Sequence, residues 1–183
     1  MPDSYITKKA LAASLKELME EMPFEKITVG DICNKCAMNR KSFYYHFKDK
    51  YDLVNWIFDI EFITIEKNNA YEDSWGPVDK LCAYFYDNRD FYRKAMRIKG
   101  QNSFPEYFRE VLTPVLEKRI LTLLNTEENL EFYSTFYADA FICAIERWLS
   151  KKDCMKPDKF VELLKSCIYY VAEKVNDEKK DQK

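Results

Sequence analysis

Glycine and proline are too scarce in this chain for a fold that depends on many tight turns. Its 183 residues contain only three glycines and six prolines. An all-β sandwich or barrel needs a turn roughly every 8–12 residues, and those turns rely on these residue types. The hydrophobic share of 47% is still high enough to build a packed core. The sequence therefore predicts an all-α protein, with about nine helices joined by short polar loops.

Positive charge is concentrated in one short segment. The whole chain has a net charge of −2, which excludes a protein that binds nucleic acid through a uniformly basic surface. Residues 35–50 carry five cations and one anion, a net charge of +4 that leaves −6 for the rest of the chain. A contact with nucleic acid therefore has to come from this segment.

The six cysteines do not indicate disulfides or a metal site. No charged and then apolar leader precedes Tyr5, so we expect a cytoplasmic protein whose cysteines are thiols. Cys33 and Cys36 alone have metal or redox spacing, and with His46 as the single histidine we expect no metal and no cofactor. Charges interrupt every apolar run before the ~18 residues of a membrane span, so no membrane partner is expected. The chain also lacks a glycine-rich phosphate loop and a catalytic constellation, which predicts that it is not an enzyme.

Three short helices are predicted at the start of the chain. Leucine and methionine recur at helical spacing over residues 7–22. Thr28, with Asp31 three positions later, is an acidic variant of the capping box and begins the second helix. Asn39 is a good N-cap for a third helix that ends near Phe47. The tight turn between the second and third helices makes this arrangement a helix-turn-helix.

The third of these helices has an unusual polar face. It carries Arg40, Lys41, Tyr44 and Tyr45, with no acidic residue before Asp49. An ordinary solvated helix mixes glutamate and lysine, whereas a basic and aromatic face suits phosphate oxygens and base edges. The face predicts DNA binding, and an accidental basic surface is the alternative.

Two motifs resemble the TetR/AcrR family of transcriptional regulators: ITVGDI at residues 27–32 and NRKSFYYHFKDKYDL at residues 39–53. The run FYYHF, with Lys50 three residues later, is specific to that family. The residues of the second motif are most similar to those of the branch that contains activators of dihydroxyacetone kinase operons. Ala37 departs from the pattern, since the family usually has glycine in this turn and alanine adopts a positive φ only with strain.

The resemblance implies a DNA-binding domain over residues 1–50 and a helical regulatory and dimerisation domain over residues 51–175. The polar residues 176–183 are expected to form a disordered tail. By the same resemblance, the predicted base contacts are Asn39, Arg40, Lys41 and Tyr44. The predicted contacts to the DNA backbone are Thr28, Ser42, Tyr45, His46 and Lys50. Cys33 and Cys36 fall where the family has small buried residues, so both are expected to be packing thiols.

The last two predicted helices, residues 127–151 and 158–175, are apolar over too wide an arc to bury one face only. One face can pack within the domain and the other against a second subunit, as the family pairs its last two helices into a four-helix bundle. Phe132, Phe136, Ala140 and Cys143 form one stripe, and the pattern alone does not say which stripe faces the partner. We assign the dimer interface to the other stripe and its neighbours: Tyr133, Tyr137, Phe141, Ile145, Trp148, Leu164 and Ile168.

Several aromatic side chains are candidates for lining an effector pocket, although aromatic residues at helical spacing are more often simply core. These candidates are Trp56, Phe85, Tyr86, Phe104, Tyr107, Phe108, Phe136 and Tyr137. The sequence does not identify the signal, which can be a small-molecule effector or a protein coactivator.

The sequence thus predicts a transcriptional regulator that binds a palindromic operator in double-stranded DNA as a homodimer, with a C-terminal domain that receives a signal. The alternative is a helical adaptor that binds other proteins through its C-terminal bundle. Such an adaptor would leave the basic face of the third helix unused, so a mobility-shift assay separates the two hypotheses.

Overall fold

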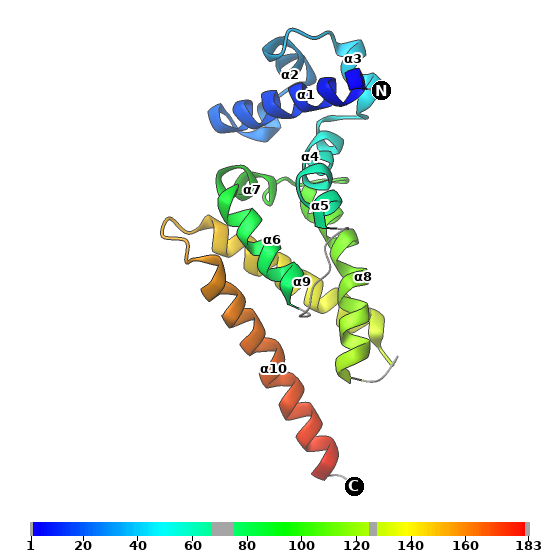
Figure 1. Cartoon of the computed structure of the whole chain (residues 1–183), viewed down its shortest axis with the longest axis vertical. Helices are drawn as coiled ribbons and strands as arrows, with labels where there is room; N and C mark the ends of the chain where they lie inside the picture. Colours follow the sequence, from blue (N-terminus) through cyan, green and yellow to red (C-terminus); the bar gives the residue numbers. More distant parts are fainter. Residues whose placement is uncertain (1, 67–74, 125–127, 182–183) are drawn as a thin grey trace. The chain divides into compact units, whose positions relative to one another are not determined.

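The computed structural model describes residues 2–66, 75–124 and 128–181 of the chain. Those ranges contain helices and no strand, so the predicted all-α class is confirmed (Figure 1). They hold nine helices when α4, η2 and α5 are taken as one continuous run, plus the 3-10 turn η1 (Phe24–Lys26). The nine are α1 (Pro2–Glu21), α2 (Val29–Lys35), α3 (Arg40–His46), the run of α4 (Lys50–Phe58), the π-helical turn η2 (Asp59–Ile63) and α5 (Thr64–Glu66), then α6 (Gly76–Asp87), α7 (Arg89–Ala95), α8 (Phe104–Leu124), α9 (Leu130–Ser150) and α10 (Pro157–Asp181).

The chain divides into two compact units. The first unit comprises residues 1–70 and 88–107, and the second comprises residues 71–87 and 108–183. The predicted helix-turn-helix lies in the first unit together with α4 and α7. The expected domain boundary after residue 50 therefore falls inside a compact unit, between α3 and the helices that pack beside it.

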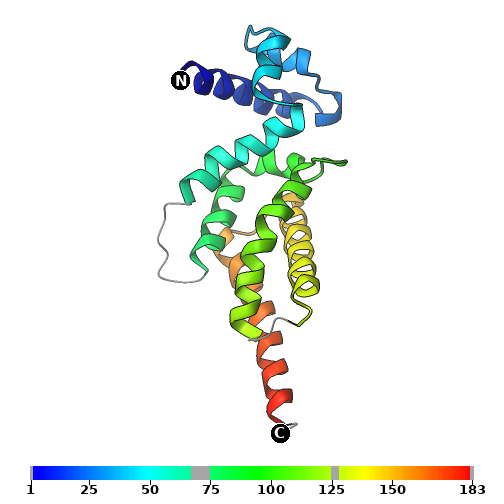
Figure 2. The same ribbon diagram turned by 90° about the vertical axis from the view of Figure 1, so that its right-hand side faces the viewer.

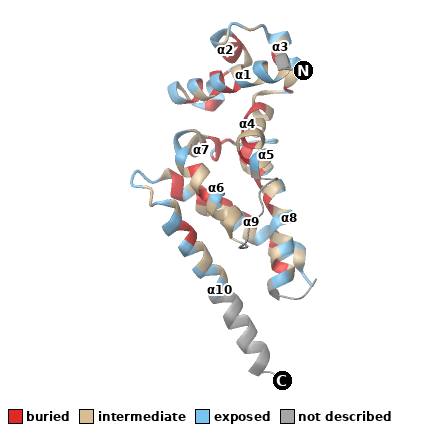
Figure 3. Cartoon of the chain, viewed as in Figure 1, coloured by how far each residue is buried: buried red, intermediate tan, exposed pale blue. Residues whose placement is uncertain are grey.

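The core of the first unit forms where α1, α2 and α3 meet. Leu11, Leu15 and Met19 recur at helical spacing and are buried on one face of α1. Ile32 of α2 and Phe43 of α3 are buried as well. Buried and exposed bands alternate along α1, as expected for a helix with one face in a core (Figure 3).

Polar contacts from α1 extend the first unit beyond residue 50. The Lys16 ammonium lies 2.7 Å from the Glu61 carboxylate in η2 and 5.4 Å from the centre of the Phe91 ring in α7. Lys94 of α7 donates a hydrogen bond to the main-chain carbonyl of Met19. These contacts explain why α4 and α7 belong to the same compact unit as the helix-turn-helix.

The second unit is built from α6, α9, α10 and the part of α8 that begins at Phe108. Helices α8 and α9 lie alongside each other, and the Arg109 guanidinium is 2.6 Å from the Asp139 carboxylate (Figure 2). Helix α6 packs against α10. The Trp148 indole of α9 stacks on the Phe160 ring of α10, with ring centres 4.2 Å apart and planes 8° from parallel. This aromatic stack anchors the end of α9 in the unit.

One observed segment end differs from the expected one. Helix α10 continues to Asp181, whereas the sequence predicts a disordered tail from residue 176. The Glu and Lys residues of that stretch have good helix propensity, so the helix extends past its last apolar residue. Helix α6 begins at Gly76, and residues 67–74 lie outside the described part of the chain. Helix α8 continues past Pro114 to Leu124.

None of the helices within residues 2–66, 75–124 and 128–181 combines the length and the apolar character that crossing a membrane requires.

Candidate nucleic-acid interface

Two buried phenylalanines fix the orientation of α3. Phe43 and Phe47 are buried, and their ring centres lie 5.7 Å apart. Their i, i+4 spacing places both rings on the same side of the helix. The polar residues between them therefore lie on the opposite, outer side.

That outer side is basic and aromatic. Arg40 and Lys41 are exposed, and the side chains of Tyr44 and Tyr45 are 59% and 82% exposed. Two large, exposed phenol rings are unusual on a small helix, because tyrosine normally buries much of its ring. The structure therefore brings together four of the nine predicted DNA contacts on one accessible surface, which we call the α3 face (Arg40, Lys41, Tyr44 and Tyr45).

Asn39 and Ser42 form the start of α3. The Asn39 side-chain oxygen accepts hydrogen bonds from the Ser42 main-chain N–H at 2.8 Å and from the Ser42 hydroxyl at 3.2 Å. The predicted N-cap at Asn39 is thereby confirmed. Both residues were also predicted to contact DNA, and in this structure these polar groups already bond to each other.

Thr28 forms the predicted capping box at the start of α2. Its main-chain N–H and its hydroxyl donate to the Asp31 carboxylate at 2.8 and 2.6 Å, and the Asp31 N–H donates to the Thr28 hydroxyl oxygen at 3.1 Å. These hydrogen bonds hold the pKa of Asp31 below its usual value. The Thr28 hydroxyl proton, predicted to reach a DNA phosphate, is already committed to a carboxylate.

Lys50 is placed differently from its prediction as a backbone contact. Its ammonium donates to the carbonyls of Phe24 and Ile27, both at 2.7 Å, and to that of Glu25 at 3.3 Å. It also lies 4.4 Å from the centre of the Phe24 ring. Burial lowers the pKa of Lys50. All three ammonium protons are thus used to join η1 to the start of α4, and the prediction missed this role because residues 24–27 are distant in sequence.

His46 lies at the edge of the α3 face, beside the N-terminal part of α1. Its Nδ1 is 3.5 Å from the Ser4 hydroxyl. Partial burial, and to a smaller extent the charge of Lys8, lower the pKa of His46. The Lys8 ammonium lies 5.4 Å from the Phe47 ring centre and 5.6 Å from that of Trp56. Lys8 is an additional cation beside the α3 face that no local motif identifies, because it belongs to a different helix.

The turn between α2 and α3 is closed by a residue in a left-handed conformation. Ala37 has φ of +54°, which confirms the strained conformation expected where the family usually has glycine. The Met38 N–H donates to the Cys33 carbonyl at 2.9 Å and the Ala37 N–H to the Asn34 carbonyl at 3.2 Å. This pair of hydrogen bonds is a Schellman motif, which requires a positive φ at its central residue.

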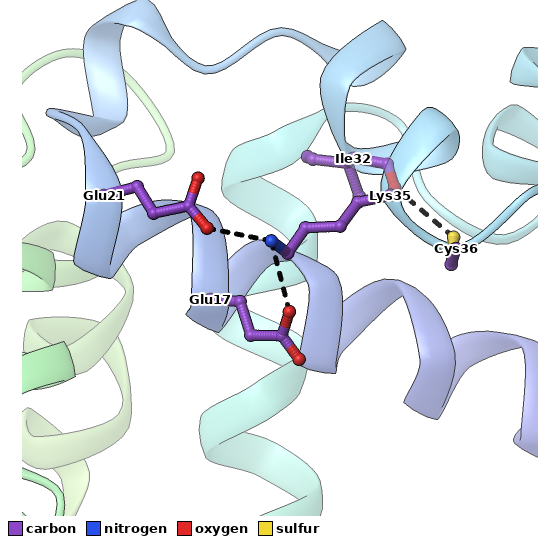
Figure 4. Close-up of polar contacts among 5 residues, drawn as sticks. All are labelled: Glu17, Glu21, Ile32, Lys35 and Cys36. Carbon is purple, nitrogen blue, oxygen red and sulfur yellow. Dashed lines mark hydrogen bonds and ion pairs between the residues drawn. The ribbon is translucent and has the colours of Figure 1, made fainter.

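Lys35 takes no part in the α3 face. Its ammonium lies 2.9 Å from Glu21 and 3.2 Å from Glu17, both on α1 (Figure 4). These carboxylates raise the pKa of Lys35. The charge of Lys35, one of the five cations in residues 35–50, is therefore neutralised by carboxylates of α1. The other four cations lie in α3 or just after it.

The two cysteines of α2 have different environments. Cys33 is buried, and burial raises the pKa of its thiol. Cys36 is half-buried, and its thiol donates to the Ile32 carbonyl at 3.3 Å (Figure 4). The expected buried packing thiol is confirmed for Cys33 and only partly for Cys36. In the described part of the chain, no three His, Cys, Asp or Glu side chains gather into a potential metal site.

The residues predicted to line an effector pocket are divided between the two compact units. Trp56, Phe104 and Tyr107 belong to the first unit, and the others belong to the second. Phe85 and Phe108 are buried against each other, with ring centres 5.4 Å apart. Of the remaining candidates, Tyr86 stacks on Trp148, Tyr137 is half-buried, and Phe136 lies on the exposed side of α9. Phe85 and Phe108, like the buried Phe104 of the first unit, are core residues, the more common role of such a pattern.

The residues of the predicted dimer stripe differ in how far they are buried. Ile145 and Trp148 are buried inside the second unit, and the other predicted residues, Tyr133, Tyr137, Phe141, Leu164 and Ile168, are half-buried. The exposed stripe of α9 contains Phe132 and Phe136, which are 67% and 57% exposed. Ala140 and Cys143 continue it. Because one residue turns a helix by about 100°, this stripe and the predicted one lie on different faces of α9.

Two family models match the chain. The model described as bacterial regulatory proteins, tetR family, matches residues 11–57. The model described as a transcriptional regulator C-terminal region matches residues 73–170. The chain is also 27% identical over 144 residues to the HTH-type dhaKLM operon transcriptional activator DhaS of Lactococcus lactis subsp. lactis (strain IL1403), which covers 78% of this chain and 74% of that protein.

Two solved structures share the fold. The dihydroxyacetone kinase operon activator DhaS superposes with a TM-score of 0.65 at 23% identity, covering 91% of this chain and 98% of that one. A TetR transcriptional regulator from Streptococcus agalactiae 2603V superposes with a TM-score of 0.70 at 20% identity, covering 88% and 93% of the respective chains.

Proposed function

Because the chain belongs to the TetR family of transcriptional regulators, we propose that it binds a palindromic operator as a homodimer, with one copy of α3 in the major groove at each half-site. The single observation that carries this proposal is the α3 face. Its exposed cations and phenols have no acidic neighbour on the helix, and DNA supplies the phosphates and base edges that such groups bind.

The individual roles follow from how each side chain is placed. We assign base contacts to Lys41 and Tyr44, which are exposed along the helix, and backbone contacts to Tyr45 and His46 at its end. Four of the other predicted residues support the helices: Asn39 and Ser42 begin α3, Thr28 begins α2, and Lys50 holds α4.

Substitution on the α3 face tests these roles. The probe is a duplex selected by the wild-type protein from a randomised library, compared with a scrambled duplex. Lys41→Ala should cost about 1–3 kcal/mol on the selected duplex and relax the preference at one base position. Lys99→Ala removes the same charge at an exposed site outside α3 and should leave specificity unchanged. Equal losses on both duplexes for Lys41→Ala would show that this lysine does not read a base.

We propose that the homodimer forms through the exposed stripe of α9 that contains Phe132 and Phe136. Their rings stack on each other, with centres 6.3 Å apart and planes 17° from parallel, and present a continuous apolar surface. Burying one such side chain is worth about 1.5–3 kcal/mol, and two-fold symmetry counts each ring twice. Leu163 and Cys167 form an exposed stripe on α10, which we assign to the same interface.

Sedimentation velocity tests this interface. The double variant Phe132→Glu/Phe136→Glu should sediment as a helical monomer at micromolar concentration. Val115→Glu places a charge at another exposed apolar residue, on α8, and should remain a dimer. A double variant that stays dimeric would show that the subunits meet elsewhere.

We also propose that the protein acts in the cytoplasm and that residues 51–175 receive its signal, from a small-molecule effector or a protein coactivator. The Lactococcus relative is named as an operon activator, which supports activation as the outcome. A reporter placed behind the selected duplex should be expressed more strongly when the protein is present, and lower expression would assign repression instead.

A further inference from the structure

Gly30, in the first turn of α2, is buried although the N-cap residue Thr28 and Asn34 of the same helix are exposed. The group that covers it is the guanidinium of Arg40, the first residue of α3. A Cβ atom at position 30 would lie 2.5 Å from Nη2, 3.2 Å from Nε and 3.3 Å from Cζ of Arg40. Non-bonded heavy atoms have their optimal separation near 3.5–4.0 Å. Any side chain at position 30 would therefore displace the guanidinium.

The backbone of α2 does not itself require glycine at this position. Gly100 is the glycine with a positive φ among the described residues, and Gly30 has a helical conformation. Glycine inside a helix is less favourable than alanine. The space that Gly30 leaves for Arg40 is thus the feature of the structure that accounts for a glycine here.

Arg40 reaches back toward α2 because side chains on a helix tilt toward its N-terminus. Its guanidinium lies across the first turn of α2, close enough to Asp31 to help lower the pKa of that carboxyl. Arg40 therefore brings positive charge to a helix start whose capping box contributes a carboxylate. Without that cation, Asp31 would oppose the approach of a DNA phosphate.

We propose that Gly30 is a positioning residue for DNA binding: it lets the Arg40 guanidinium lie flat on α2, where the guanidinium contacts a DNA phosphate rather than a base. The planar guanidinium suits this contact because its parallel N–H groups can bind two phosphate oxygens at once. The inference rests on the proposed function and changes the predicted role of Arg40 from base contact to backbone contact. Sequence is then read by the residues further along α3.

A double-mutant cycle tests the coupling between the two residues. Affinities of Gly30→Ala, Arg40→Ala and the double variant are measured on the selected and scrambled duplexes at several salt concentrations. Each single variant should weaken both duplexes by a similar factor, roughly tenfold, and reduce the salt slope by about 0.9. Gly30→Ala should add nothing once Arg40 is alanine. Asn34→Ala, which raises helix propensity at an exposed site of the same helix, is the matched control and should bind normally.

Three results would overturn the inference. Losses that simply add would mean that Gly30 does not act through Arg40. A loss of affinity confined to the selected duplex, or to one base pair within it, would show that Arg40 contacts a base. An unchanged affinity for Gly30→Ala would show that the guanidinium position is irrelevant to binding.

Two further measurements keep the outcome clear. Gly30→Ala should melt no lower than the wild type, and if it does melt lower, Arg40→Ala alone still distinguishes phosphate from base contact without altering α2. If the wild-type protein shows no preference for the selected duplex, the proposed function itself fails. If that preference is present but the cycle shows no coupling, only the role of Gly30 fails.

Discussion

Replacing Ala37 by glycine should stabilise the helix-turn-helix, although it removes a methyl group. Ala37 has φ of +54°, a conformation that costs an L-residue about 1–2 kcal/mol. Glycine has no such penalty, but it increases the conformational entropy of the unfolded chain by about 0.4–1 kcal/mol. Ala37 is exposed, so no packing is lost. The balance is a net stabilisation on the order of 0.5–1 kcal/mol.

Hydrogen exchange at the Met38 amide reads this effect locally, because that N–H closes the turn by donating to the Cys33 carbonyl. Ala37→Gly should slow exchange there and raise the melting temperature by about 1–4 °C. Ala13→Gly is the matched control, since Ala13 is exposed within α1 and glycine should cost about 1 kcal/mol there. Destabilisation by both substitutions would refute the argument that Ala37 is strained.

Two further substitutions test assignments in the same unit. Lys50→Met should destabilise the first unit by ~1–3 kcal/mol, because three carbonyls lose a charged donor. The salt dependence of DNA binding should not change. A salt slope reduced by about 0.9 would show instead that Lys50 contacts a DNA phosphate. Since the pKa of His46 is lowered in the folded chain, folding favours its neutral form, and stability should fall as the pH drops below about 6.5. His46→Asn should remove that pH dependence of stability. A variant whose stability varies with pH as the wild type's does would show that His46 is not the group responsible.

Features encoded within a few residues could be predicted from the sequence. The capping box at Thr28 and the N-cap at Asn39 were both predictable because a cap and its partner lie three positions apart. The i, i+4 spacing of Phe43 and Phe47 is a local signal of the same kind, and both rings are buried. The positive φ of Ala37 followed from its departure from a family pattern. In each case the determining contact is local.

The features that the sequence did not provide depend on contacts between distant segments. Periodicity shows that α9 has two apolar stripes, but only packing against the rest of the second unit decides that Ile145 is inside and Phe136 outside. Lys50 looks like a surface cation until η1 is placed beside it. Gly30 and Arg40 are ten positions apart and meet because the turn at Ala37 folds α3 back beside α2. Residue type and spacing carry no signal of these pairings.

Protection of guanine N7 atoms from methylation most directly tests the claim that two copies of α3 enter the major groove. Guanine N7 lies in that groove, where a bound helix blocks access to it. On the selected duplex, the wild-type protein should protect two groups of guanines whose centres are about one helical turn apart, or a whole multiple of that distance. A duplex bound with no protected guanine N7, or with protection spread evenly along it, would contradict recognition through α3.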